Sequence, residues 1–268
     1  MLRLIAISTI ALLTGCASYA TPGRGAQMDL FGGGGGNPQD PRAQADIKAA
    51  NTDTGIQQVL DKKPLASFPA SLALVRVQAP GYVSYTARGW GGGAYTVLTT
   101  RDVEKPEDVS RINSFANVRG VAPLNRLVIP TVLNSDFELR AAAARMRADI
   151  LVLYTIDTVF HETDRTTPLT VVSLGAVDNK RLRIISTASA ALLDTRSGYV
   201  YGLAEASGEH EELQNAYKTE EEIDRIRRDV ESKAFAGLVG EMESTWKLVL
   251  SEHNRPGGAS RADVYRTE

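Results

Sequence analysis

Cys16 is the only cysteine in this chain of 268 residues, and it ends the run Leu12-Leu13-Thr14-Gly15-Cys16. A single cysteine leaves the fold without an internal disulfide and without a zinc site built from several cysteine ligands. The folded part must therefore be stabilised by packing alone. With 43% hydrophobic residues, the chain has enough apolar side chains to build a core.

The residues before Cys16 have the pattern of a secretory signal. Arg3 gives a short basic start, residues 4–13 are mainly apolar, and the small pair Thr14-Gly15 precedes the cysteine, as is typical of bacterial lipoproteins. The apolar stretch is too short to cross a bilayer, which takes about 20 residues. The pattern predicts that residues 1–15 are a signal peptide and that Cys16 carries palmitate and further acyl chains. An ordinary secretory signal with an incidental cysteine is the alternative.

Residues 16–66 are expected to form a lipidated, flexible linker rich in glycine and proline. The glycine run at 32–36 and the segment 37–41 cost much backbone entropy to order and offer little to bury. A phosphate-binding loop is excluded, because no apolar strand precedes the glycines and no Lys-Ser or Lys-Thr pair follows them. About 30 flexible residues would span about 30 Å on average. Weak helical spacing predicts a short helix within 46–60 that packs on the domain.

A single α/β (α+β) domain is expected over residues 67–252, followed by a loose tail at 253–268. Strands are predicted at 72–77, 126–129, 150–160, 169–174, 182–193 and 199–206, and helices after Pro106, from Ser135 and from Thr219. Ser135 with Glu138, and Thr219 with Glu222, have the spacing of capping boxes. The expected architecture is a mixed β-sheet flanked by helices, with a long C-terminal helix and a disordered N-terminal tether.

Two hairpins are predicted in this domain. Aromatic and β-branched residues on both sides of the glycine-rich segment 89–93 indicate a long hairpin over 82–99. An edge hairpin is the simpler interpretation, and contact of Trp90 and the tyrosines with lipid or a partner is the alternative. The second hairpin turns at Asp194 to Gly198, because Asp194 can accept hydrogen bonds from the amides ahead of it and Gly198 can adopt a positive φ.

Two segments carry a family resemblance. A capped helix leads through Ala148-Asp149-Ile150 into a long strand, and a Thr-Ala-Ser-Ala-x-Leu-Leu-Asp-x-x-x-Gly hairpin ends at Gly198. Over residues 72–250 the chain resembles the α/β domain of envelope lipoproteins related to CsgG and LpoB, which is also similar to the N-terminal domain of TolB. The resemblance implies a protein that recruits or regulates envelope machinery, or assembles into a secretion pore, rather than an enzyme.

Catalytic and metal-binding patterns are weak. The three histidines, in a predicted loop, at a strand end and at a helix end, are His161, His210 and His253. His161 and Asp164 could serve a metal site or an accessory hydrolase, but no further ligand stands at a recognisable spacing. Asp157 and Asp194 could act as acid and base only if the fold brought their carboxyls together. We therefore expect no enzyme, no cofactor and no metal site.

These observations predict a lipid-anchored protein of the bacterial outer membrane that faces the periplasm. Ser18 stands where an aspartate retains lipoproteins in the inner membrane in the enterobacterial pattern. The predicted function is a non-catalytic docking or assembly module for an envelope complex, with the membrane, through Cys16, and an envelope protein or further copies of itself as partners. A formal net charge of −2 gives no support to nucleic-acid binding.

An oligomeric secretion or transport pore subunit is the alternative function. In that case the segments 82–99 and 160–174 would become membrane hairpins, whose strands need about 9–11 alternating residues each. Arg88, Asp164 and Arg165 lie within or beside these segments and count against it.

Overall fold

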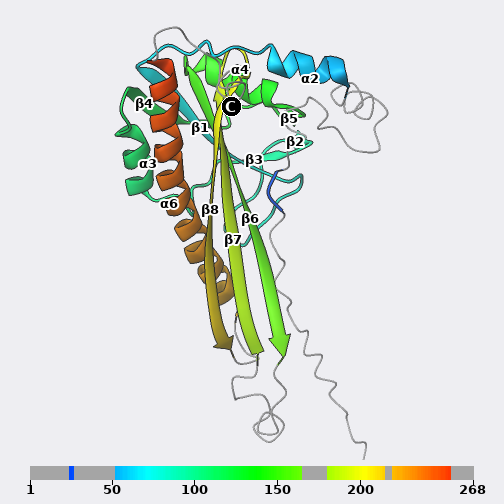
Figure 1. Cartoon of the computed structure of the whole chain (residues 1–268). Coiled ribbons are helices and arrows are strands. Elements are labelled where there is room, and N and C mark those ends of the chain that lie inside the picture. Colours follow the sequence, from blue (N-terminus) through cyan, green and yellow to red (C-terminus); the bar gives the residue numbers. More distant parts are fainter. Residues whose placement is uncertain (1–23, 27–51, 165–179, 215–218, 255–268) are drawn as a thin grey trace, which may run out of the picture.

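The computed structural model describes residues 24–26, 52–164, 180–214 and 219–254 (Figure 1). Within these ranges, the main sheet has six strands in the order β3-β1-β6-β7-β8, with β4 also paired to β1, and β2 pairs with β5 in a small second sheet. The elements are α2 (Asp53–Leu60), β1 (Ala70–Gln78), β2 (Gly92–Gly93), β3 (Thr96–Leu98), α3 (Pro106–Asn113), β4 (Val118–Pro123), β5 (Val132–Leu133), α4 (Asp136–Arg145), β6 (Ile150–Asp164), β7 (Lys180–Asp194), β8 (Val200–Gln214) and α6 (Glu220–His253). The predicted α/β class with a mixed sheet and a long C-terminal helix is confirmed.

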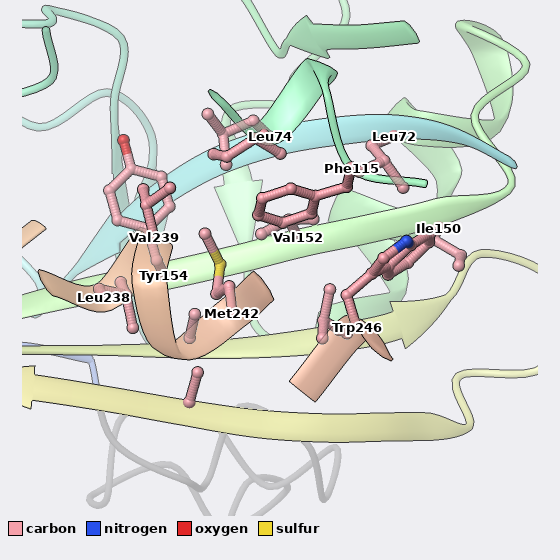
Figure 2. Packing of buried hydrophobic residues seen from close by; sticks show 14 of the residues in the cluster. Leu72, Leu74, Phe115, Ile150, Val152, Tyr154, Leu238, Val239, Met242 and Trp246 are labelled. Atoms are coloured by element: carbon pink, nitrogen blue, oxygen red, sulfur yellow. The ribbon is translucent and has the colours of Figure 1, made fainter. Parts of the chain in front are cut away.

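Helices cover both faces of the sheet at the end where β1 pairs with β6. On one face, Leu74 and Val152 pack with α3 and α6, and Met242 and Trp246 of α6 lie in the same cluster (Figure 2). On the other face, β1 and β6 pack against α4 through a second cluster. Successive residues of a strand point to opposite faces, so the continuous apolar runs of β1 and β6 are explained by burial on both sides.

The two predicted capping boxes are confirmed. In α4, the Ser135 side chain accepts a hydrogen bond from an early backbone amide, and Glu138 Oε2 accepts one from the Ser135 amide at 2.9 Å. In α6, Thr219 and Glu222 make the same reciprocal pair at 3.3 and 3.1 Å. These side chains satisfy amides that have no partner inside the helix, which fixes where each helix begins.

Strands β6, β7 and β8 form a three-stranded ribbon that extends past the rest of the sheet (Figure 1). Each has 15 residues, and both pairs are antiparallel. β1 pairs with β6 only over Leu72–Val75, opposite Ile150–Leu153. Beyond that point α6 covers one face of the ribbon. β6 and β8 are longer than predicted, and the strand predicted at 169–174 lies outside the described residues.

The predicted long hairpin over 82–99 is wrong. Only single bridges join Val83 to Arg88 and Trp90 to Val97, while β2 pairs with β5 and β3 pairs with β1. Tyr82 and Tyr95 are 2% and 1% exposed. Tyr82 and Tyr95 fold inward because these two side chains gain more by burial in the domain than by lining an exposed hairpin.

The strand predicted at 126–129 is also wrong. The segment is a turn in which the Asn125 side chain accepts a hydrogen bond from the Leu127 amide at 2.9 Å, and Leu127 is 94% exposed. The strand of this region is β4, which pairs parallel with β1. Asparagine favours such a local turn over a strand. The apolar residues of 126–129 by themselves therefore led to a wrong strand prediction.

Gly208 of β8 lets α6 approach the sheet closely, and Gly208→Ala is expected to destabilise the domain by about 1–3 kcal/mol. A Cβ at this position would lie 2.9 Å from the Val230 carbonyl oxygen and 3.1 Å from the Ala234 amide nitrogen. Both atoms belong to the backbone of α6, so they cannot move away from the added Cβ as a flexible side chain could. The measurement is the free energy of unfolding in urea.

Gly120→Ala is the matched control, because a Cβ on this strand residue meets nothing within 4 Å. It should be neutral or slightly stabilising, since alanine reduces the entropy of the unfolded chain. Equal losses in the two variants would show that β8 and α6 are not in contact at Gly208.

Candidate functional site

The ribbon has one face that none of the described helices covers, and we call this the open face. Over residues 182–189 of β7 and 203–212 of β8, residues under α6 are more buried than those on the opposite side, in alternation, whereas residues 190–194 of β7 are all buried. Val159 and Leu203 on the open face are 44% and 59% exposed. Its described members are Thr155, Asp157, Val159, His161, Arg183, Ile185, Thr187, Ser189, Leu203, Glu205, Ser207, Glu209 and Glu211.

Polar side chains on the open face are held by bonds between strands. Ser189 donates to Glu205 at 2.8 Å, the hydroxyls of Thr187 and Ser207 lie 3.1 Å apart, and an Arg183 guanidinium nitrogen lies 2.8 Å from a Glu209 carboxylate oxygen. Such cross-strand pairs stabilise a sheet and fix side-chain positions. The face therefore presents an ordered polar surface with two exposed apolar residues.

A groove of about 650 Å³ lies on this face, next to the segment Arg24 to Ala26, which we call the N-terminal latch. The latch makes a bridge with the end of β1, where Ala79 donates its amide to the Arg24 carbonyl at 2.9 Å. The Ala26 amide donates to Thr155 Oγ1 at 2.8 Å, and the Gly25 amide donates to Asp157 Oδ1 at 3.3 Å. The latch thus joins the N-terminal segment directly to the open face.

Gln78 explains why the latch lies at this position. β1 and β6 separate beyond Leu153, and the fully buried Gln78 side chain fills the gap. Its amide nitrogen donates to the Ile156 carbonyl, and its oxygen accepts from Thr155, both at 2.8 Å. A Cβ on Gly25 would lie 2.9 Å from Thr155 Oγ1, so glycine is what permits this close contact. The sequence gives no local signal for the latch, because its partners lie far along the chain.

A second group of polar residues is buried between β1, the segment before α3 and α6. We call it the buried ion cluster, and its members are Arg76, Asp102, Glu104, Asp224, Arg227 and Glu231. Arg227 lies 2.9 Å from Asp224 and 2.7 Å from Glu231, and Arg76 lies 3.1 Å from Glu231. The cluster connects the helix to the strand through charge-assisted bonds.

The charges of the cluster shift the pKa values of Arg76 and of the neighbouring Tyr154. Burial disfavours the Arg76 cation, but the nearby carboxylates of Glu231 and Glu104 outweigh it and raise the pKa of Arg76. Burial, together with the Glu104 charge, raises the pKa of Tyr154 well above its usual value, and its hydroxyl donates to Glu104 at 2.6 Å. Because Arg76 is buried between carboxylates that pair with it, the cluster suits a structural role.

The catalytic candidates from the sequence are not brought together. Asp157 lies opposite Thr187 and Asp194 lies opposite Ile150, so they are seven residues apart along β6, about 23 Å. Asp194 instead closes the β7–β8 turn as predicted. It accepts from the amides of Arg196 and Ser197 at 2.8 and 3.0 Å, and Gly198 has a φ of 69°.

The histidines are separated from one another. His161 lies in β6 opposite Arg183, and not in the predicted loop, because the strand continues to Asp164. His210 Nε2 lies 3.4 Å from Glu212, and the tilted rings of His253 and Phe68 have their centroids 4.6 Å apart. Among the described residues, no group of three or more potential metal ligands is found. Cys16 lies outside these residues, so its acylation stays a prediction.

None of the helices within the described ranges is long and apolar enough to cross a membrane. The latch and α2 lie inside the segment 16–66, which the sequence predicts to be a flexible linker. The apolar residues Ile56, Val59 and Leu60 of α2 are exposed, so the prediction that this helix packs on the domain through them is wrong. The predicted bounds of the α/β domain, residues 67–252, stay a prediction.

No protein-family model matches this chain, and no curated protein matches it. Among solved structures, it is similar to a PelC dodecamer from Paraburkholderia phytofirmans, with a TM-score of 0.28 and 9% identity over 68% of this chain and 94% of that one. A lipoprotein from Neisseria meningitidis has a TM-score of 0.27 and 13% identity over 68% and 99% of the two chains. A protein from Xanthomonas campestris has a TM-score of 0.29 and 10% identity over 71% and 91%. With TM-scores this low, these similarities assign neither a family nor a function, and the grouping with CsgG, LpoB and TolB is not confirmed.

Proposed function

We propose that this protein is a lipid-anchored component of the bacterial envelope, held in the outer membrane by Cys16, whose α/β domain is a non-catalytic docking module for another envelope protein. The observation that carries the proposal is the open face of β6, β7 and β8. An ordered polar surface with exposed Val159 and Leu203 is the composition of a non-obligate interface, which combines apolar contacts with polar surroundings.

The charge on the open face indicates the kind of partner. Asp157, Glu205 and Glu209 supply carboxylates, and Arg183 is already paired with Glu209. Complementary charge steers association and selects partners. The docking segment of the partner is therefore expected to carry lysine or arginine beside an apolar side chain.

The latch supports an anchored role for the same face. Arg24 follows Cys16 by only eight residues. Eight extended residues span at most about 29 Å, so a lipid on Cys16 would keep the open face within that distance of the bilayer. The segment that separates the lipid from the first contact with the domain, Cys16 to Arg24, is then much shorter than residues 16–66.

Photo-crosslinking tests this function in intact cells that carry the full chain. With benzoylphenylalanine at Leu203, we expect one envelope protein to be crosslinked and recovered through a tag after Glu268. The matched control is Leu248 on α6, which is 57% exposed and does not lie on the open face. Crosslinking at Leu203 and not at Leu248 supports docking, and equal labelling contradicts it.

The same experiment separates the alternative function. A pore subunit would crosslink only to copies of itself and would run as a large assembly on a native gel in detergent. That function also requires the segment 82–99 to leave the domain, although Tyr82 and Tyr95 are almost fully buried. A large self-assembly without another protein would overturn the docking proposal.

A further inference from the structure

The groove on the open face has walls from two distant parts of the chain. The latch forms one wall, and residues of β6, β7 and β8 form the rest, among them Asp157, Ser189 and Glu205. The groove has its volume of about 650 Å³ while the latch is in place. The latch therefore lies at the side of the groove and leaves room for another molecule beside it.

The backbone of the latch makes the hydrogen bonds that hold it in this position. The Arg24 carbonyl accepts from the Ala79 amide at 2.9 Å, and the amides of Gly25 and Ala26 donate to side chains of β6. Gly25 is buried, whereas Arg24 is exposed and lines the groove. These bonds fix one wall of the groove without using the Arg24 side chain.

The charged groups of the groove indicate what it would bind. Among its lining residues, Asp157 and Glu205 carry carboxylates, and Arg24 of the latch carries a guanidinium. The two carboxylates belong to β6 and β8, which flank β7 and so lie about 10 Å apart. An extended peptide fits this arrangement if it places a lysine or arginine beside the carboxylates and an oxygen acceptor beside Arg24.

Thr155 and Asp157 connect the latch to the groove. Both side chains line the groove, and each accepts a hydrogen bond from an amide of the latch. Thr155 also donates to Gln78 at 2.8 Å, so its hydroxyl is held from two sides. Release of the latch would remove one wall of the groove and take the Arg24 donor away from it.

We propose that the latch completes the docking groove, so that the open face binds its partner more tightly while the latch is in place. This inference rests on the proposed function, because it concerns the control of docking at the same face. By linkage, a partner that contacts the latch also stabilises the latch. Arg24 lies eight residues after Cys16, so docking is coupled to a position within about 29 Å of a lipid on Cys16.

Gly25→Val tests the inference in the full-length, lipidated chain. A Cβ on Gly25 would lie 2.9 Å from Thr155 Oγ1, which cannot turn away without breaking its bond to Gln78. We expect faster hydrogen exchange of the latch amides in the purified protein. In intact cells, we expect several-fold less crosslinking of the partner from benzoylphenylalanine at Leu203.

Gly92→Val is the matched control. Gly92 is an exposed residue of β2, outside the ribbon, and a Cβ there meets nothing within 4 Å. This variant should leave both the exchange of the latch amides and the crosslinking at Leu203 unchanged. An equal loss of crosslinking in the two variants would contradict a specific role of the latch.

Deletion of residues 24–26 removes the latch even if Gly25→Val does not release it, and deletion of residues 33–35 removes the same number of residues as its control. Equal crosslinking in the 24–26 deletion and the wild type would overturn the inference and leave the docking function standing. Stronger crosslinking in that deletion would also overturn it, because the latch would then compete with the partner. No crosslinking at Leu203 in the wild type would instead contradict the proposed function, and the inference with it.

Discussion

Replacement of Arg227 by methionine is expected to destabilise the domain by about 3–5 kcal/mol, the usual cost of removing one partner from a buried ion pair. The Arg227 side chain is 0% exposed and contacts Asp224 and Glu231, which are 0% and 1% exposed. Methionine is close in length and apolar, so the loss reports the uncompensated carboxylates rather than a cavity. The measurement is the free energy of unfolding in urea at neutral pH.

Arg111→Met is the matched control, because Arg111 also pairs with a glutamate of α6. The distance to Glu243 is 2.9 Å, but the two side chains are 51% and 29% exposed. An exposed pair contributes about 0–1 kcal/mol. A loss at Arg227 no larger than at Arg111 would contradict the conclusion that the cluster joins α6 to the sheet.

Replacement of Asp194 by alanine is expected to cost at least about 3 kcal/mol, since hydrogen bonds to a charged group contribute about 1.5–3 kcal/mol each. Its carboxylate accepts from the amides of Leu65, Arg196 and Ser197 and from the Tyr201 hydroxyl at 2.6 to 3.0 Å. Removing it leaves several donors of the turn without their acceptor. Thermal and urea unfolding measure the loss.

The acid dependence of this loss follows from the titration of Asp194. Burial by itself would raise its pKa, but the amides of Ser197 and Leu65 and the Tyr201 hydroxyl stabilise the carboxylate, so the pKa is lowered. A lowered folded pKa gives stability that is fully present above the unfolded value of about 3.9 and is lost as the pH falls through the folded pKa. The cost of D194A should therefore be constant near neutrality and shrink in acid.

Asp229→Ala provides the comparison for Asp194. Asp229 pairs with Lys233 on the surface, and both side chains are 56% exposed. Surface substitutions of this kind usually stay within about 0.5 kcal/mol. If D229A and D194A were equally unstable, the turn would not depend on the Asp194 carboxylate.

The sequence predicted well the features whose causes lie within a few residues. The capping boxes at Ser135 and Thr219 are local, because each hydroxyl and its amide are at most three residues apart. The turn from Asp194 to Gly198 is local in the same way.

The sequence does not predict which face of the ribbon stays open or which residues the latch contacts. Alternation along β8 indicates one covered and one exposed face, but which face α6 covers depends on close packing at Gly208. The Gly25 latch depends on Thr155 and Asp157, about 130 residues further on. Spacing along α6 could have revealed Asp224, Arg227 and Glu231 as a charged group.

The sequence by itself determined the α/β class, the helix starts, the turn at Asp194 and the pattern expected to anchor the chain at Cys16. Each of these depends on neighbouring residues, so a short stretch of chain contains the whole cause. Only the tertiary structure decided that Tyr82 and Tyr95 fold inward, that the ion cluster is buried and that the apolar residues of α2 are exposed. These outcomes depend on partners brought close by folding, and the burial energy of each residue is set by those distant neighbours.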